Sequence, residues 1–295
     1  MRALEVFLLK SMTGCGSGRA EIATIQVAVE LKAVNGRFLK VSVKAPPAYA
    51  SLEGELEAVV RERLRRGSVT LAIYVTRTDL GPAAEVNAEL AAAYKTAFER
   101  LGLPVHVVGL LPGVVVDRQQ GKPSEVAADE RRLVSEALGA ALAELVRMRE
   151  REGAALKTAI AAILARMVEV RAVVRARAPE VVKGYKARLE ARLAELIGTG
   201  QAGVDPALLA REVAVFADRA DITEELERLA AHFEHARELL AQGDDVGRRL
   251  DFLAQEMLRE ANTIGSKSAD ASLSQQVVEL KAQVEQLKEQ VANVE

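Results

Sequence analysis

The final segment of the chain carries the pattern that most restricts how it can fold. From residue 273 to residue 294 its apolar residues are separated alternately by four and three positions: Leu273, Val277, Leu280, Val284, Leu287, Val291 and Val294. This spacing is the a/d pattern of a coiled-coil helix, sustained over three heptads. Another helix must cover such a seam, and the pattern allows that helix to come from the same chain or from a neighbouring subunit.

The first part of the chain has the period of β-strands instead. Apolar and polar residues alternate over 22–30, 38–44 and 69–76, which predicts three half-buried strands. Asn35-Gly36 lies between the first two and predicts a hairpin turn. The glycines from Gly14 to Gly18 predict a tight turn before the first strand, and a helix is expected over 52–66.

From about residue 83 onward, apolar spacings of three and four dominate and predict helices. We expect them near 85–101, 124–150, 153–176, 179–197, 206–241, 247–263 and 273–294. The sequence therefore predicts an α+β protein: an N-terminal β-sheet-and-helix region, then a long, mostly α-helical region that ends in the heptad helix. The expected domains are residues 11–122, a helical middle region with a linker at 123–205, and a C-terminal helical domain at 206–295 that carries a polar motif.

Composition excludes several classes of function. The formal net charge of −2 argues against strong, unspecific attraction to nucleic acid over the whole surface. Cys15 is the single cysteine, so neither a disulfide framework nor a cysteine zinc cluster is expected. The glycines around it lack the Lys-Ser/Thr of a P-loop, so no nucleotide cofactor is expected. No apolar run is long enough to span a membrane, and we expect a cytoplasmic protein.

The helix expected at 247–263 is strongly two-sided. At 100° per residue, Leu250, Leu253, Met257 and Ile264 share one stripe. Polar side chains share another face: Arg248, Asp251, Gln255, Arg259 and Asn262. Arginine and lysine can bind phosphate oxygens, and carboxylates can hold a divalent metal. This combination suits phosphodiester chemistry, although an exposed helix with internal ion pairs would show the same pattern.

Two further charged clusters have an ordinary structural explanation. The acids of residues 218–227 could supply metal ligands, but Asp221 or Thr223 at a helix start would equally account for them. Arg61 and Arg66 belong to a basic helix end, RERLRRG, which could grip phosphates or complement the C-terminal helix dipole.

Three longer motifs resemble the YicC/YloC-like family of bacterial endoribonucleases. They are SMTGCGSGRAE at 11–21, ELKAVNGRFLKV at 30–41 and GRRLDFLAQEMLREANTIGSKSAD at 247–270, and the similarity covers nearly the whole chain from Ser11. The resemblance implies an RNA phosphodiesterase that uses a divalent metal and assembles as a homohexamer. Two positions depart from the usual pattern, since Cys15 and Gly36 stand where the family usually has large rings.

Carried onto this sequence, the resemblance names the expected site. Asp251, Glu256, Arg259 and Glu260 would be catalytic, and the three acids among them would hold Mg²⁺ or Mn²⁺. RNA would be bound by Asn35, Arg37, Arg248, Arg249, Asn262, Ser266 and Lys267, the last two in a loop that begins at Gly265. The basic helix end adds Arg61 and Arg66 to the expected RNA-binding residues.

We therefore expect an endoribonuclease that acts with divalent-metal assistance in RNA turnover or small-RNA decay. One alternative is a non-catalytic RNA-binding adaptor that acts with another nuclease. The other is a structural homo-oligomer whose charged helix makes only ion pairs between subunits. The three hypotheses differ in which charged residues should abolish function when they are substituted.

Overall fold

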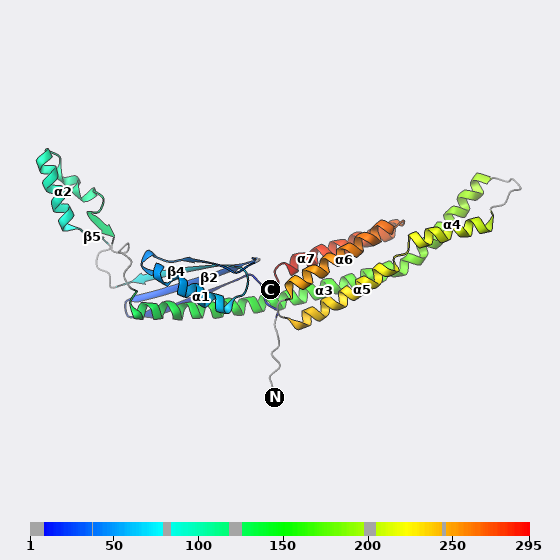
Figure 1. Cartoon of the computed structure of the whole chain (residues 1–295), viewed down its shortest axis with the longest axis horizontal. Helices are drawn as coiled ribbons and strands as arrows, with labels where there is room; N and C mark the ends of the chain where they lie inside the picture. Colours follow the sequence, from blue (N-terminus) through cyan, green and yellow to red (C-terminus); the bar gives the residue numbers. More distant parts are fainter. Residues whose placement is uncertain (1–8, 37, 79–83, 118–125, 198–204, 244–245) are drawn as a thin grey trace, which may run out of the picture. The chain divides into compact units, whose positions relative to one another are not determined.

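The chain folds as an α+β protein, as predicted (Figure 1). A computed structural model describes residues 9–36, 38–78, 84–117, 126–197, 205–243 and 246–295. They form two compact units, one within residues Met12–Arg149 and one within Glu150–Glu295 together with Leu9–Ser11. The expected middle region at 123–205 is not a unit of its own, because its main element, helix α3 (Ala128–Ile197), contributes residues to both.

The first unit is built on a four-stranded sheet in the order β1-β2-β4-β3. The strands are β1 (Gly14–Ile22), β2 (Ile25–Val34), β3 (Lys40–Lys44) and β4 (Ser68–Arg77). Helix α1 (Glu53–Arg63), which follows the short 3-10 helix η1 (Pro47–Leu52), and the first part of α3 cover one face. Val29, Leu31 and Leu71 of the sheet are buried there with Leu56 and Leu138 of the helices.

The predicted hairpin at Asn35-Gly36 is wrong. β2 and β3 do not pair, because β4 lies between them and runs parallel to β3. Parallel neighbours need a crossover connection, which η1 and α1 provide. The hairpin of this sheet joins β1 to β2 instead, through a turn that includes Ala23 with a φ of 42°.

The predicted turn at Gly14–Gly18 is also wrong, because these glycines form strand β1. They face α3 at very short range: a Cβ on Gly16 would lie 2.1 Å from the Ala141 carbonyl oxygen, and one on Gly18 would lie 2.0 Å from that of Ala137. At the edge of the sheet, the Ser17 N–H donates to the Glu144 carboxylate over 2.6 Å. The glycines thus allow β1 to pack directly against the helix backbone.

A second, smaller sheet completes this unit. Strands β5 (Ala84–Val86) and β6 (Val115–Asp117) pair antiparallel around helix α2 (Ala88–Leu101) and the 3-10 helix η2 (Val105–Leu110). Asn87 caps α2 by accepting a hydrogen bond from the Leu90 N–H at 3.1 Å. The helix expected at 85–101 is therefore confirmed, whereas these two short strands were not predicted.

The second unit is helical. It contains the later part of α3 with α4 (Pro206–Arg219), α5 (Thr223–Gln242), α6 (Gly247–Lys267) and α7 (Ala271–Val291). All seven heptad residues of the final segment are buried, together with residues of α3, α5 and α6. The chain itself therefore covers the seam. None of the described helices is both long and apolar enough to cross a membrane.

The largest differences from the predicted helix boundaries are in α3 and between α4 and α5. The segments expected at 124–150, 153–176 and 179–197 are one continuous helix that includes Gly153 and Pro179. Gly153 allows close approach of residue 9, since a Cβ there would lie 1.8 Å from the Leu9 carbonyl oxygen. The helix expected at 206–241 is instead divided into α4 and α5, because the Asp221 carboxylate accepts hydrogen bonds from the Thr223 N–H and hydroxyl, which begins a new helix.

Candidate nucleic-acid interface

Helix α6 lies in the second unit with its apolar stripe turned inward, as predicted. Leu250, Leu253, Met257 and Ile264 are buried, and so is Ala261 between them. The helix continues four residues past the expected end, to Lys267, so Ser266 and Lys267 belong to its last turn and not to a loop. Gly265 lies within that turn, where a Cβ would be 3.2 Å from the Val277 Cγ1 atom of α7. The inward face is therefore fixed by packing against α7.

The outward face of α6 presents four of the nine predicted RNA-binding residues to solvent, namely Arg248, Arg249, Asn262 and Ser266. Its exposed side chains are Arg248, Arg249, Gln255, Arg259, Asn262 and Ser266. Arg249 donates to the side chain of Gln242 over 3.0 Å. Arginine on such a face can bind phosphate oxygens through a planar, two-pronged set of N–H groups.

An aromatic ring stands among these polar groups. Phe252 is 61% exposed, although it is a large apolar residue. It follows Leu250 by two positions, which turns it roughly 200° away from the buried stripe at about 100° per residue. Helical periodicity therefore could have identified it, and our prediction omitted it. An exposed ring beside arginines can stack on an unpaired base.

Two of the predicted catalytic acids stay partly accessible on this helix. The Asp251 carboxylate accepts a hydrogen bond from the Gln255 amide at 2.9 Å. The Glu256 carboxylate lies 4.0 Å from the Arg259 guanidinium, one turn further along. These two acids and Arg259 are the predicted catalytic residues that the structure leaves open to a ligand.

Two other residues of α6 that were predicted for the site, Glu260 and Lys267, form ion pairs within the helical unit. Glu260 is only 4% exposed and lies 3.5 Å from the Arg228 guanidinium of α5. The Lys267 ammonium donates to the Glu225 carboxylate and to the Asp221 carbonyl oxygen, both at 2.8 Å. Glu225 is itself buried, so these contacts tie α6 to the start of α5. Packing accounts for Glu260 and Lys267 without a ligand.

A protein-held metal does not fit this arrangement. Across the parts of the chain that the structure describes, no three His, Cys, Asp or Glu residues gather so that they could hold a metal ion. Asp251 and Glu260 are nine residues apart on one helix, which separates them by roughly 13 Å along its axis. The three acids predicted as ligands therefore do not form a site within one chain.

The predicted residues at the N-terminal end belong to the other unit. Asn35 follows β2 and is exposed, while Arg37 lies outside the described residues. Arg61 pairs with Glu57 one turn earlier on α1 at 2.5 Å. The Arg66 Nε atom is buried and has no hydrogen-bond partner. These residues thus belong to a different compact unit from α6.

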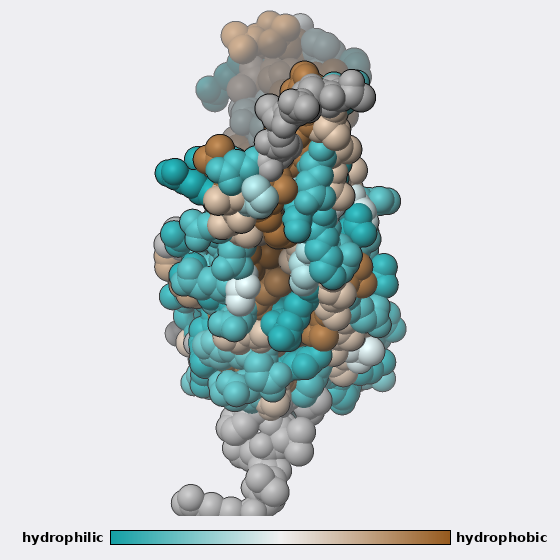
Figure 2. Space-filling model, turned by 90° about the vertical axis from the view of Figure 1, so that its right-hand side faces the viewer, coloured by the Kyte–Doolittle hydropathy of each residue, from teal (hydrophilic) through white to brown (hydrophobic). Residues whose placement is uncertain are grey.

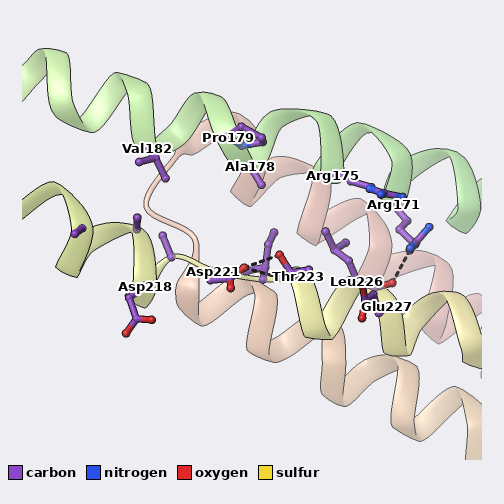
Figure 3. A pocket seen from close by; sticks show the side chains of 14 residues that line it. Arg171, Arg175, Ala178, Pro179, Val182, Asp218, Asp221, Thr223, Leu226 and Glu227 are labelled. Atoms are coloured by element: carbon purple, nitrogen blue, oxygen red, sulfur yellow. Dashed lines mark hydrogen bonds between the residues drawn. The ribbon is translucent and has the colours of Figure 1, made fainter.

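The helical unit also contains a cavity of about 770 Å³ between α3, α4 and α5 (Figure 3). Arg171 and Arg175 of α3 line it together with the acidic residues Asp218, Asp221 and Glu227. The Arg171 Nε donates to the Leu226 carbonyl oxygen at 2.6 Å, and burial together with the neighbouring Arg175 lowers the pKa of Arg171. Because acids and bases here are nearly balanced, the cavity by itself indicates no particular ligand.

The region of α4 and the end of α3 exposes apolar residues. Viewed from that end, a strip of hydrophobic residues runs between hydrophilic ones (Figure 2). Leu196 of α3 and Leu208 of α4 are 75% and 61% exposed. α4 is held to α3 by the stacked rings of Tyr185 and Phe216, whose centroids are 3.8 Å apart. Apolar surface of this kind commonly marks contacts with another protein.

The fold and the α6 surface together define an α+β protein with a cationic, amide-containing helix face suited to phosphate ligands. Comparison with known families gives the class a name. Residues 9–158 match the N-terminal region, and residues 174–295 the C-terminal part, of the family described as endoribonuclease YicC-like. The chain belongs to this family.

Two curated relatives span nearly the same length. A protein of Clostridioides difficile (strain 630) is 32% identical over 300 residues, which cover 97% of this chain and 99% of the relative. A protein of Haemophilus influenzae is 31% identical over 274 residues, covering 90% and 92%. Each of the two is named "Probable endoribonuclease YicC".

Proposed function

We propose that this protein is an endoribonuclease that binds RNA on the exposed face of α6 and hydrolyses its phosphodiester bonds there. The observation that carries the proposal is that face itself: arginine, amide and phenyl side chains point outward along one helix, in the segment that also carries the family motif. The names of the two relatives support the reaction. A role in RNA turnover or small-RNA decay, in the cytoplasm, is part of the proposal.

The accessible side chains have separate tasks in this proposal. Arg248 and Arg259 bind phosphate oxygens and offset negative charge as it develops on the phosphorus centre. Phe252 stacks on a base and so fixes the strand on the helix. Glu256 accepts a proton from the attacking water, since its carboxylate is partly exposed and stands beside Arg259. As the bond from phosphorus to the leaving oxygen breaks, that oxygen takes a proton from solvent.

Dependence on Mg²⁺ or Mn²⁺ remains a prediction. A bound divalent ion would stabilise charge on the phosphate. No group of three acids or other ligands stands ready for it among the described residues. The roles proposed for Arg248, Phe252 and Glu256 therefore do not depend on a metal site within one chain.

The same observation favours the second candidate, a non-catalytic RNA-binding adaptor. A protein that only delivers RNA needs Arg248, Arg259 and Phe252 but no acid, and Glu260 is already engaged with Arg228. The adaptor therefore predicts that neutralising Glu256 changes nothing, whereas the endoribonuclease predicts loss of cleavage.

A cleavage time course tests the proposal. A labelled, structured RNA of about 25 nucleotides is incubated with wild type and with Glu256→Gln, each with Mn²⁺, Mg²⁺ or EDTA. We expect internal cuts by wild type, with a rate at least 100-fold lower for Glu256→Gln and RNA affinity within about twofold, since general acid–base groups contribute roughly 10²–10⁴ to rate. Cuts that persist in EDTA would contradict the metal prediction only.

Glu285→Gln is the matched control, because Glu285 and Lys288 of α7 form a similar pair three residues apart at 3.1 Å. It should cleave as wild type does. Tight binding without cuts in any metal would establish the adaptor, and equal cleavage by Glu256→Gln and wild type would remove Glu256 from the mechanism.

Assembly into a homohexamer is also part of the proposal. The exposed apolar side chains of Leu196 and Leu208 support an interface between copies at the α3 and α4 end of the helical unit. Light scattering of wild type and of Leu208→Gln would show a smaller mass for the variant if this surface is used.

A further inference from the structure

The open face of the four-stranded sheet differs from the face that α1 and α3 cover. Along β2, Val27, Val29, Leu31 and Ala33 point to the core and are buried, so the alternate residues point the other way. On β4 the same alternation buries Val69, Leu71 and Ile73. The outward-pointing residues of all four strands therefore form one continuous surface within this unit.

Basic side chains border this surface on both sides of β4. Lys32 extends from β2, and Lys40 and Lys44 extend from β3; all three are exposed. Lys32 and Ser42 both pair with Thr70 of β4, so the lysines of the two strands stand roughly 10 Å apart across it. Arg19 of β1 adds a fourth positive charge to the same face.

No acidic side chain of the described residues pairs with any of these four cations. Among the described residues, the side chains of Arg19, Lys32, Lys40 and Lys44 make no hydrogen bond or ion pair, in contrast to the many paired arginines on the helices. Glu21 and Glu30 also lie on this face, which leaves an excess of two positive charges. A positive excess on one sheet face is notable in a chain whose total charge is −2.

Strand β4, which lies between the lysines, carries small outward-pointing side chains and one exposed aromatic ring. Ser68, Thr70 and Ala72 are small, and the next outward residue of β4 is Tyr74, which is 55% exposed. Ala28 is the β2 neighbour of Tyr74, and β3 ends before reaching it. The ring is thus uncovered on both sides, and its hydroxyl has no partner among the described residues.

We infer that this open sheet face is a second RNA-contacting surface, which binds single-stranded RNA through its backbone phosphates at Lys32, Lys40 and Lys44 and through stacking of one base on Tyr74. The inference takes only its ligand class from the proposed function and adds a surface that lies outside α6. Lysines that flank a strip of small residues, with an exposed ring at its end, are the elements that single-strand binders combine.

Charge and stacking favour single-stranded RNA over other ligands for this face. A polyanion complements the positive excess, and an unpaired strand can offer a base face to Tyr74, which a continuous duplex cannot. A second copy of this chain would bring its own lysines against these four cations, and Glu21 and Glu30 are too few to balance them. The surface therefore favours a flexible nucleic-acid strand.

Fluorescence anisotropy with a labelled 12-nucleotide oligouridine tests the inference, with EDTA present to prevent metal-dependent cleavage. Combined Lys32→Gln, Lys40→Gln and Lys44→Gln should weaken binding at least tenfold. Because each lost phosphate contact lowers the salt dependence of single-strand binding by about 0.7 in log–log slope, the slope should fall by roughly 2. Tyr74→Thr should weaken binding about fivefold or more, and Tyr74→Phe should not.

The control removes three charges elsewhere: Lys95→Gln, Lys157→Gln and Lys186→Gln. An equal loss of RNA affinity in this control would mean that only the net charge of the protein matters, and it would overturn the inference. So would unchanged affinity in the sheet variants, a 12-base-pair duplex that binds wild type as tightly as the oligouridine, or a change of oligomeric mass without a change of RNA affinity. Circular dichroism and a thermal melt confirm that each variant is folded.

The outcomes also separate this surface from the α6 proposal. If Glu256→Gln cleaves like wild type but the sheet variants lose oligouridine, the catalytic proposal fails and the sheet inference stands. If Glu256→Gln abolishes cleavage while the sheet variants bind and cleave normally, the sheet inference alone fails.

Discussion

The two ends of helix α6 carry similar residues but use them differently. From Arg248 to Arg259 the charged groups face solvent, and their contacts are confined to neighbouring turns or to the end of α5. At Glu260 and Lys267 the charges face α5, where each meets a partner of opposite sign. The difference shows that charge density alone does not locate a binding surface, because the helical phase decides whether a charge meets a ligand or another helix.

The largest effect should come from the buried end of α6. Lys267→Met would leave the Glu225 carboxylate without its cation. Glu225 is only 5% exposed, and its Oε2 atom has no hydrogen-bond partner even in the wild type. Because a buried charge that loses its partner is costly, the free energy of unfolding should fall by about 3 kcal/mol. Urea denaturation measures this loss.

Arg248→Met is the comparison for that experiment, because Arg248 stands on the exposed end of the same helix. A surface change of this kind should alter the free energy of unfolding by no more than about 0.5 kcal/mol. Similar losses in the two variants would remove the distinction between the ends of α6.

The next effect concerns RNA instead of stability. Combined Arg248→Gln and Arg259→Gln should weaken binding of the 25-nucleotide RNA at least tenfold, since charge-assisted contacts to phosphate are lost. The unfolding midpoint in urea should not change. An intact affinity with a lower midpoint would mean that these arginines support the fold and not the ligand.

Phe252 should have a somewhat smaller effect. Phe252→Ala removes a ring that is 61% exposed, so the core is untouched. Loss of one stacked base should weaken RNA binding about fivefold or more, and Phe252→Tyr should restore it. If Phe252→Ala instead changes the mass of the assembly in light scattering, the ring belongs to a subunit contact.

The smallest effect is expected at the loop after α6, and only in acid. Asp270 accepts hydrogen bonds from the Arg177 guanidinium and from the Leu273 N–H, which lowers the pKa of its carboxyl below the ordinary 3.8. A lowered carboxyl pKa stabilises the fold above the unfolded value, and this contribution disappears as pH falls through the folded value. Wild type should therefore be more stable than Asp270→Asn at pH 6, and the difference should shrink below pH 4 in thermal melts.

Sequence periodicity predicted those parts of the fold that depend on neighbours in the chain. The stripe of α6 and the heptad seam of α7 were both correct, because apolar spacing along one helix already defines its buried face. The cap at Asp221 was foreseen as an explanation of the acidic cluster, although it divides a helix that was expected to continue. Local chemistry was thus sufficient for these elements.

Contacts between distant residues were beyond the same reasoning. The Asn35-Gly36 turn has hairpin chemistry, but β4 pairs with β2 from more than thirty residues away and displaces β3. Likewise the family resemblance assigned Glu260 and Lys267 to the site, and the sequence did not show that they pair with Arg228 and Glu225 of another helix. A sequence shows which residues are charged, whereas only the packing shows which charges are already engaged.

The glycines of β1 have a consequence for the order in which the sheet forms. Gly16 and Gly18 bring no side chain to the core and fit only against the finished backbone of α3. The β1–β2 hairpin is a local pairing, but an isolated two-stranded hairpin is marginally stable, so β1 is held firmly only once α3 packs against its glycines. In pulsed hydrogen exchange during refolding, the amides of β2 and β4 should become protected before those of β1.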